Sequence, residues 1–138
     1  MPAVRGYAKD YVEAARARLD AELSAHAKLR KAAAHSLAES EIQALEQGRL
    51  ADLLIALDAR FTGRGRVAED GHPFNEVRVL AAAALAADGI VRSVRAVRYD
   101  PAKAVLGLKI GEPPVLTAAG VKRLGIAFLD AIEGRRGA

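Results

Sequence analysis

The sequence predicts a mostly α-helical α+β fold, in which long N-terminal helices precede a small helix, β-hairpin and helix unit. Three observations predict it. Residues 7–47 contain no glycine or proline and consist mainly of strong helix formers. β-Branched residues gather over 90–110, and helical spacing returns over 117–133. We therefore divide the chain into a helical segment, 1–61, and a small α+β domain, 62–138.

The first part of the chain has an apolar residue at every fourth position, which is typical of an amphipathic helix: Tyr7, Tyr11, Ala15, Leu19 and Leu23. Two overlapping capping-box patterns follow, one beginning at Ser36 and the other at Ser40. They predict that the first helix ends near His35 and that a second begins within residues 37–41. A single helix running through both serines is the alternative.

The second helix has its apolar residues at i, i+3, i+4, i+7 and i+11: Leu50, Leu53, Leu54, Leu57 and Phe61. Two such helices form an αα-hairpin or a coiled-coil-like segment. The apolar stripe of the first helix is thin, so we expect the rest of the chain or another subunit to complete it. The residues expected at an oligomer interface are Tyr11, Leu19, Leu23, Leu50, Leu53 and Leu57.

The segment after the break at residues 62–73 predicts three further elements. Pro73 suits the first position of a helix over 73–88, with Glu76 in the first turn and Gly89 as the C-cap. A hairpin over 90–110 turns at "DPAK", and Thr117 is the expected N-cap of a helix over 117–133. Because a two-stranded hairpin alone is marginally stable, a homodimer or higher oligomer is favoured.

The composition excludes several classes of protein. There is no cysteine, which rules out disulfides, thiolate metal sites and cysteine nucleophiles and fits a reducing compartment. Charged residues interrupt every apolar run long before the ~18 residues that a membrane span needs. We expect a soluble, cytoplasmic protein without membrane contact, and the alanine- and arginine-rich composition is typical of a GC-rich bacterial genome.

The basic charge is unevenly distributed. The formal net charge is +4, and it comes entirely from residues 61–138, because the first 60 residues carry equal numbers of basic and acidic side chains. Arginine binds phosphate oxygens bidentately, so a polyanion-binding face is one hypothesis, formed by Arg64, Arg66, Arg92, Arg95, Arg98 and Arg123. Scarce aromatics argue against base stacking and favour sequence-tolerant backbone contacts. Arginine used for solubility is the alternative.

The segment "EDGHPFNE" is the most enzyme-like part of the chain. Asp70, His72 and Glu76 could hold a divalent cation or serve as acid and base. A second histidine at metal-ligand spacing is missing, and a turn, an N-cap region and a favourable helix-dipole charge explain the same residues. No serine lies in a nucleophile-elbow motif. We assign no catalytic residue and no cofactor.

These observations favour a non-enzymatic function. We expect an oligomeric interaction protein, an adaptor or assembly subunit of a bacterial-type cytosolic complex. The expected partner is another copy of the same chain, and a different protein is a further possible partner. A sequence-tolerant nucleic-acid-associated protein is the first alternative, and a small enzyme or metal protein centred on Asp70, His72 and Glu76 is the second.

Overall fold

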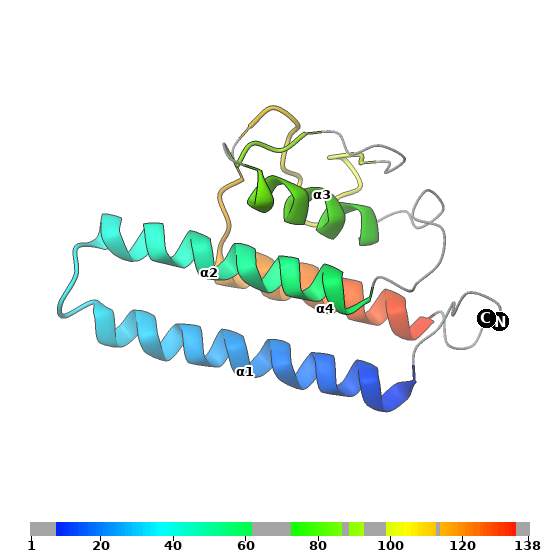
Figure 1. The fold of residues 1–138 in the computed structure, drawn as a ribbon, viewed down its shortest axis with the longest axis horizontal. Coiled ribbons are helices and arrows are strands. Elements are labelled where there is room, and N and C mark those ends of the chain that lie inside the picture. The colour runs from blue at the N-terminus through cyan, green and yellow to red at the C-terminus, as the bar shows by residue number, and fades with distance from the viewer. Residues whose placement is uncertain (1–7, 62–72, 87–88, 93–98, 113, 135–138) are drawn as a thin grey trace.

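Four helices make up most of the chain that the computed structural model describes, which comprises residues 8–61, 73–86, 89–92, 99–112 and 114–134. They are α1 (Lys9–Ala33), α2 (Glu39–Arg60), α3 (Phe74–Leu85) and α4 (Ala118–Gly134). The first two form a long antiparallel hairpin, α4 runs along one side of that hairpin, and α3 packs on α2 (Figure 1).

The predicted break between the first two helices is confirmed. α1 ends at Ala33 and α2 begins at Glu39, so the chain forms a hairpin and not one continuous helix. Neither predicted capping box forms, because Ala38 occupies the N-cap of α2 and provides no side-chain cap. Glu39 and Glu41 in the first turn instead place negative charge at the positive end of the helix dipole.

The core is a single cluster to which all four helices contribute. Its largest fully buried side chains include Leu54 of α2, Phe61 directly after α2 and Leu80 of α3. Leu124 and Phe128 of α4 complete this group. Each such side chain contributes roughly 1.5–3 kcal/mol when buried. The ring of Phe128 contacts those of Phe61 and Phe74, with centroids 5.7 and 5.2 Å apart. The three phenylalanines of the sequence therefore meet in one place.

The contact between α1 and α4 is close and partly ionic. Gly125 of α4 faces Leu19 of α1 without a side chain between them. On the surface, Arg16 of α1 binds Asp130 at 2.6 Å and Glu133 at 3.1 Å. The hydrogen bond with Glu133 raises the pKa of the Arg16 guanidinium, despite the opposing effect of burial. These contacts fix the side of the hairpin that α4 covers.

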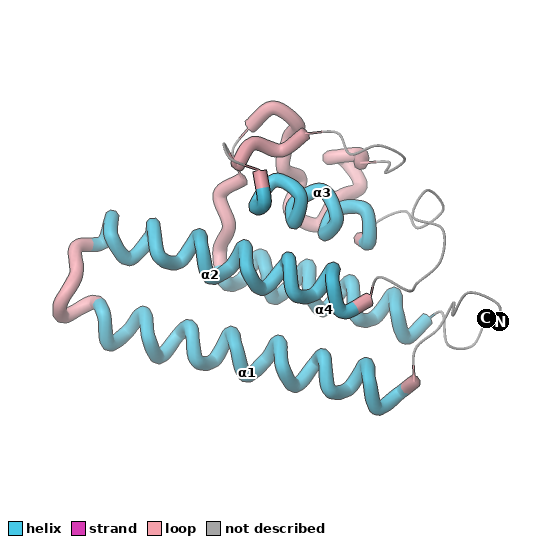
Figure 2. The backbone as a smooth tube through the Cα atoms, in the orientation of Figure 1, coloured by secondary structure: helices cyan, strands magenta, loops and turns pink. Residues whose placement is uncertain are grey.

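The predicted β-hairpin over 90–110 is wrong. The described residues of that stretch contain no strand, so the described fold is all-α and not α+β (Figure 2). Two hydrogen bonds join the two arms that were expected to pair: Val91 N–H donates to the carbonyl of Glu112 at 3.0 Å, and Gly111 N–H donates to that of Val91 at 2.7 Å. No regular ladder extends from this contact within the described residues.

The backbone groups that a hairpin would have paired find other partners. The N–H groups of Val105 and Leu106 donate to the two carboxylate oxygens of Glu76, at 2.7 and 2.8 Å. Asp100 accepts from Ala102 N–H at 3.0 Å and starts a turn. Gly107 has a positive φ of 66°, which bends the chain away from an extended course. A buried side chain of α3 thus replaces the neighbouring strand.

The other end of this segment is held by α2. The side-chain amide of Gln47 donates to the carbonyl of Leu116 at 2.6 Å, and its oxygen accepts from the N–H of Leu116 at 2.7 Å. Thr117 then caps α4 as the sequence predicts, since its hydroxyl accepts from Gly120 N–H at 3.0 Å. The segment before α4 is therefore fixed at both ends by side chains from helices.

Tyr99 shows the burial of this segment and provides a test of it. Its hydroxyl donates to the carbonyl of Leu108, and burial, with the charge of Glu76 adding to it, raises the pKa of Tyr99 to about 12. The folded state therefore keeps the phenol proton where the unfolded state loses it. Stability should be unaffected below about pH 10 and should fall as the pH rises from there toward 12.

An absorbance titration of tyrosinate checks this expectation. One tyrosine should ionise only near pH 12, and Tyr99→Phe should remove that late step. A late step that persists in Tyr99→Phe would contradict the assignment.

Candidate functional site

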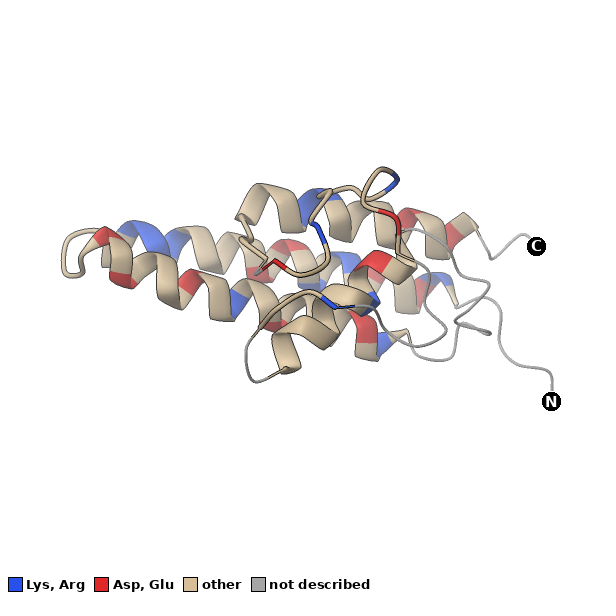
Figure 3. Ribbon diagram, turned by 90° about the horizontal axis from the view of Figure 1, so that it is seen from above, with Lys and Arg blue, Asp and Glu red and all other residues tan. Residues whose placement is uncertain are grey.

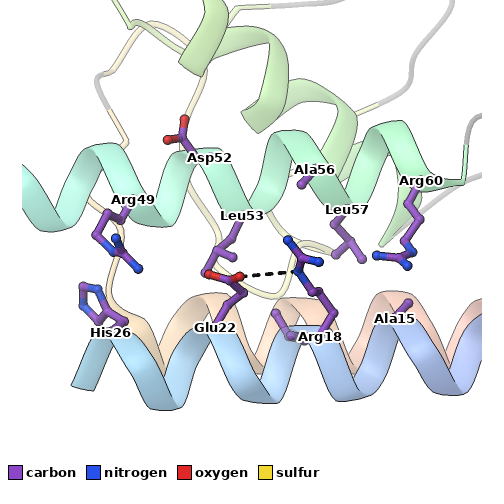
Figure 4. Close-up of a pocket in the computed structure, with 11 residues that line it drawn as sticks. Ala15, Arg18, Glu22, His26, Arg49, Asp52, Leu53, Ala56, Leu57 and Arg60 are labelled. Atoms are coloured by element: carbon purple, nitrogen blue, oxygen red, sulfur yellow. Dashed lines mark ion pairs between the residues drawn. The ribbon is translucent and has the colours of Figure 1, made fainter. Parts of the chain in front are cut away.

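A groove lies between α1 and α2 on the face of the hairpin away from α4 (Figure 4). Its volume is about 390 Å³, within the range of small-molecule sites. It is lined by Ala15, Arg18, Leu19, Glu22, His26, Arg49, Asp52, Leu53, Ala56, Leu57 and Arg60.

Helical spacing explains why these residues share one face. On α1 the lining positions are 15, 18, 19, 22 and 26, and on α2 they are 49, 52, 53, 56, 57 and 60, so lining residues recur at each helical turn. Leu19, Leu53 and Leu57 provide an apolar floor. Ala15 and Ala56 have no atoms beyond Cβ, so the space between the two helices stays open beside them.

Three arginines surround this floor. The guanidinium of Arg18 points from α1 toward α2, whereas those of Arg49 and Arg60 point from α2 toward α1 (Figure 4). Arg18 pairs with Glu22 at 3.4 Å. The carboxylate of Asp52 points away from α1. Positive charge therefore converges over an apolar surface.

Arg60 is held in place by a tyrosine of α1. Its guanidinium lies over the ring of Tyr11, with 5.5 Å to the centroid. The hydroxyl of Tyr11 donates to the carbonyl of Arg60 at 2.5 Å. Such a cation–π contact orients the arginine without occupying its N–H donors.

A buried histidine closes the groove at its other end. His26 is only 4% exposed, and its Nε2 lies 2.9 Å from a carboxylate oxygen of Glu46. The same oxygen lies 3.4 Å from Nη1 of Arg30. Within the described residues, Nδ1 of His26 and Nε of Arg60 have no hydrogen-bond partner. Buried donors or acceptors without partners cost about 1–3 kcal/mol each.

Beyond His26 the groove becomes an almost wholly apolar hollow, flanked by Leu29, Ala33, Ile42 and Leu45. We call residues 27–45 the hairpin end. It projects past α3 and α4 in both views of the fold (Figures 1 and 3). Three of its leucines are exposed: Leu29 by 51%, Leu37 by 37% and Leu45 by 61%.

The charges of the hairpin end are separated by helix. Lys28 and Lys31 are exposed on α1, whereas Glu39 and Glu41 are exposed on α2. Arg30 of α1 joins the two helices through ion pairs with Glu39 and Glu46 of α2. The hairpin end therefore offers an apolar centre with basic charge on one side and acidic charge on the other.

The six residues expected at an oligomer interface lie elsewhere on the hairpin. Leu19, Leu50 and Leu57 are buried in the core of the chain, and the ring of Tyr11 contacts that of Phe61. The two remaining leucines, 23 and 53, are half-buried. Packing within the chain uses most of this stripe.

The expected polyanion face is described only in part. Arg92 and Arg123 are exposed. Arg64, Arg66, Arg95 and Arg98 lie outside the described residues. The nucleic-acid hypothesis therefore stays a prediction.

The expected metal or acid–base cluster is also incomplete. Asp70 and His72 lie outside the described residues, and Glu76 is fully buried with both oxygens bound to backbone N–H groups. Across the described ranges, no group of three or more metal-ligating side chains comes together. The carboxylate of Glu76 thus has a structural role, because it accepts hydrogen bonds from the backbone of residues 105 and 106.

The sequence predicted three residues of the groove, Leu19, Leu53 and Leu57, as part of an oligomer interface, but it did not reveal the charged residues of the groove or the exposed leucines of the hairpin end. For the hairpin end a signal was present, because Leu29 lies outside the every-fourth apolar spacing of its helix. Leucines off the core-facing stripe indicate a second apolar face.

Neither a family model, nor a curated protein, nor a solved structure is significantly similar to this chain. In the part of the chain that is described, no helix combines the length and apolar character needed to cross a bilayer. The groove and the hairpin end therefore carry the functional proposals.

Proposed function

We propose that this chain is a non-enzymatic interaction protein that pairs with a second copy of itself through the hairpin end. The observation that carries the proposal is the group of exposed leucines Leu29, Leu37 and Leu45. Two of them flank one apolar hollow, and no other described helix covers them. Exposed apolar residues elsewhere, such as Leu85 and Val115, do not line this hollow.

Charge complementarity favours a second copy as the occupant. In a two-fold symmetric dimer the same patch is used by both subunits. The basic side of one hairpin end, with Lys28 and Lys31, can then lie beside the acidic side of the other, with Glu39 and Glu41. The leucines would meet in the centre, where each subunit also presents its hollow.

The size of the patch sets the expected affinity. Only the last turns of α1, the connection and the first turns of α2 take part, so the interface falls near or below about 1,200 Å² in total. We expect a dissociation constant in the micromolar range and a readily reversible dimer. This suits an adaptor or assembly subunit, and the cytoplasmic location stays a prediction.

Light scattering coupled to size-exclusion chromatography tests the dimer over a concentration series. The mass should rise from monomer toward dimer with concentration. Leu45→Glu should keep the chain monomeric, because an unpaired carboxylate would be buried in the apolar centre of the interface. Leu45 is 61% exposed in the single chain, so the fold should not change.

Leu85→Glu is the matched control. Leu85 lies at the end of α3 and is 73% exposed, so the same substitution adds the same charge away from the hairpin end. Its mass profile should equal that of the wild type. A wild type that stays monomeric at every concentration, or a Leu45→Glu variant that dimerises normally, would rule the proposal out.

A further inference from the structure

We infer that the groove between α1 and α2 binds a small organic carboxylate with an apolar body. This inference is independent of the dimer, because the groove lies nearer the α3–α4 end of the hairpin. The two sites share only His26 and Arg49 among their lining residues.

The apolar part of the ligand is indicated by the floor. Leu19, Leu53 and Leu57 line the groove, and all of its lining residues come from α1 and α2. The volume of about 390 Å³ suits a compact molecule and not a folded segment. Removing an apolar group from water against these leucines would supply the main attraction.

The anionic part of the ligand is indicated by the charged side chains of the groove, because its acids are paired or point away while some of its arginines are not paired. Glu22 already pairs with Arg18, and Asp52 points away from α1. Arg49 is exposed and has no hydrogen bond or ion pair within the described residues, and the guanidinium of Arg60 points from α2 toward α1. A guanidinium presents paired N–H donors that match the two oxygens of a carboxylate.

The surrounding acids select a single negative charge. Glu22 borders the groove, and Glu46 lies behind His26 at hydrogen-bond distance. Three arginines and two acids, Glu22 and Asp52, line the groove, so its net formal charge is +1, which one carboxylate balances and a multiply charged phosphate group exceeds. His26 lines that end of the groove, and its Nε2 is already engaged by Glu46. A monoanionic carboxylate therefore fits better than a polyanion.

Calorimetric titration with phenylbutyrate tests the inference, and phenylbutanol serves as the uncharged analogue of the same size. The wild-type chain should bind the acid and should bind the alcohol at least about tenfold more weakly, since the charged contact is lost. Arg49→Gln should weaken acid binding about tenfold. Arg49 is exposed, so the helical circular dichroism of this variant should be unchanged.

Arg123→Gln is the matched control, because Arg123 is an exposed arginine of α4 that does not line the groove. Its affinity for phenylbutyrate should equal that of the wild type. The titrations should give the same result in the Leu45→Glu background, which separates the groove from dimerisation.

Four outcomes would overturn the inference. They are no binding of phenylbutyrate, equal affinity for the acid and the alcohol, unchanged affinity in Arg49→Gln, and binding of inorganic phosphate in place of phenylbutyrate. A monomeric wild type that still binds phenylbutyrate would contradict the dimer alone.

Discussion

Replacing Glu76 with alanine is expected to lower the free energy of unfolding by about 3 kcal/mol. Glu76 is fully buried, and its two oxygens accept from the N–H groups of Val105 and Leu106. Hydrogen bonds to a charged group are worth about 1.5–3 kcal/mol each. The alanine variant loses both and leaves two backbone donors without an acceptor.

Urea unfolding and amide hydrogen exchange measure this effect. In Glu76→Ala the amides of Val105 and Leu106 should lose their protection from exchange. The protection of amides in the middle of α1 should fall only by the loss of global stability. Glu13→Ala is the control, because Glu13 is exposed and, among the described residues, pairs with Lys9 one turn away. That variant should change stability by less than about 0.5 kcal/mol. Unchanged protection of both amides in Glu76→Ala would contradict this role of the carboxylate.

Replacing Gly125 with valine is expected to cost roughly 2–3 kcal/mol of stability. A Cβ at Gly125 would lie 2.5 Å from Cδ2 of Leu19, closer than side-chain atoms approach one another. Cδ1 and Cγ of Leu19 lie 3.5 and 3.6 Å from the same point, so relief requires the whole Leu19 side chain or the helix to shift. The substitution should push α1 and α4 apart, and urea unfolding should show a lower midpoint concentration.

Gly48→Val is the matched control in α2. A Cβ at Gly48 meets nothing within 4 Å, so the same substitution adds a side chain in open space. Valine and glycine differ in helix propensity by less than about 0.5 kcal/mol, and stability should change by no more than that. Equal effects at the two glycines would show that helix propensity, and not the α1–α4 contact, decides the result.

The helices could be predicted from the sequence because each carries its own local signal. The glycine- and proline-free stretch and the regular leucine spacing place α1 and α2. Thr117 marks the start of α4, where it forms the expected cap. Pro73 precedes α3, although that helix ends at Leu85, three residues before the predicted end. These features depend on residues close together in the chain.

The β-hairpin was mispredicted because the deciding interaction is distant in sequence. β-Branched residues and the turn at Asp100 favour strands locally, but the backbone of Val105 and Leu106 bonds to a carboxylate 29 and 30 residues away. A buried glutamate that accepts from backbone donors leaves no periodic pattern. From the sequence, Glu76 was therefore interpreted as a cation ligand or as a favourable charge at the helix N-terminus, and not as an acceptor for distant backbone N–H groups.

The groove could not be predicted from the sequence because it too depends on contacts between residues that are distant in the chain. Leu19 and Leu57 belong to the predicted stripe but also reach the core, so the stripe alone does not tell which face remains open. That depends on where α4 lies, and its position follows from Gly125 and Arg16, far apart in the chain. Arginines facing each other across two helices are likewise visible only once the hairpin is formed.

A distance measurement between spin labels tests the proposed dimer most directly. The chain has no cysteine, so a single label can be placed at Ser40→Cys, exposed in the hairpin end, or at Asp10→Cys, at the far end of α1. We predict a short distance between subunits from position 40, a longer one from position 10, and loss of both in the Leu45→Glu background. A shorter distance from position 10 than from position 40, or no coupling at either position, would contradict association through the hairpin end.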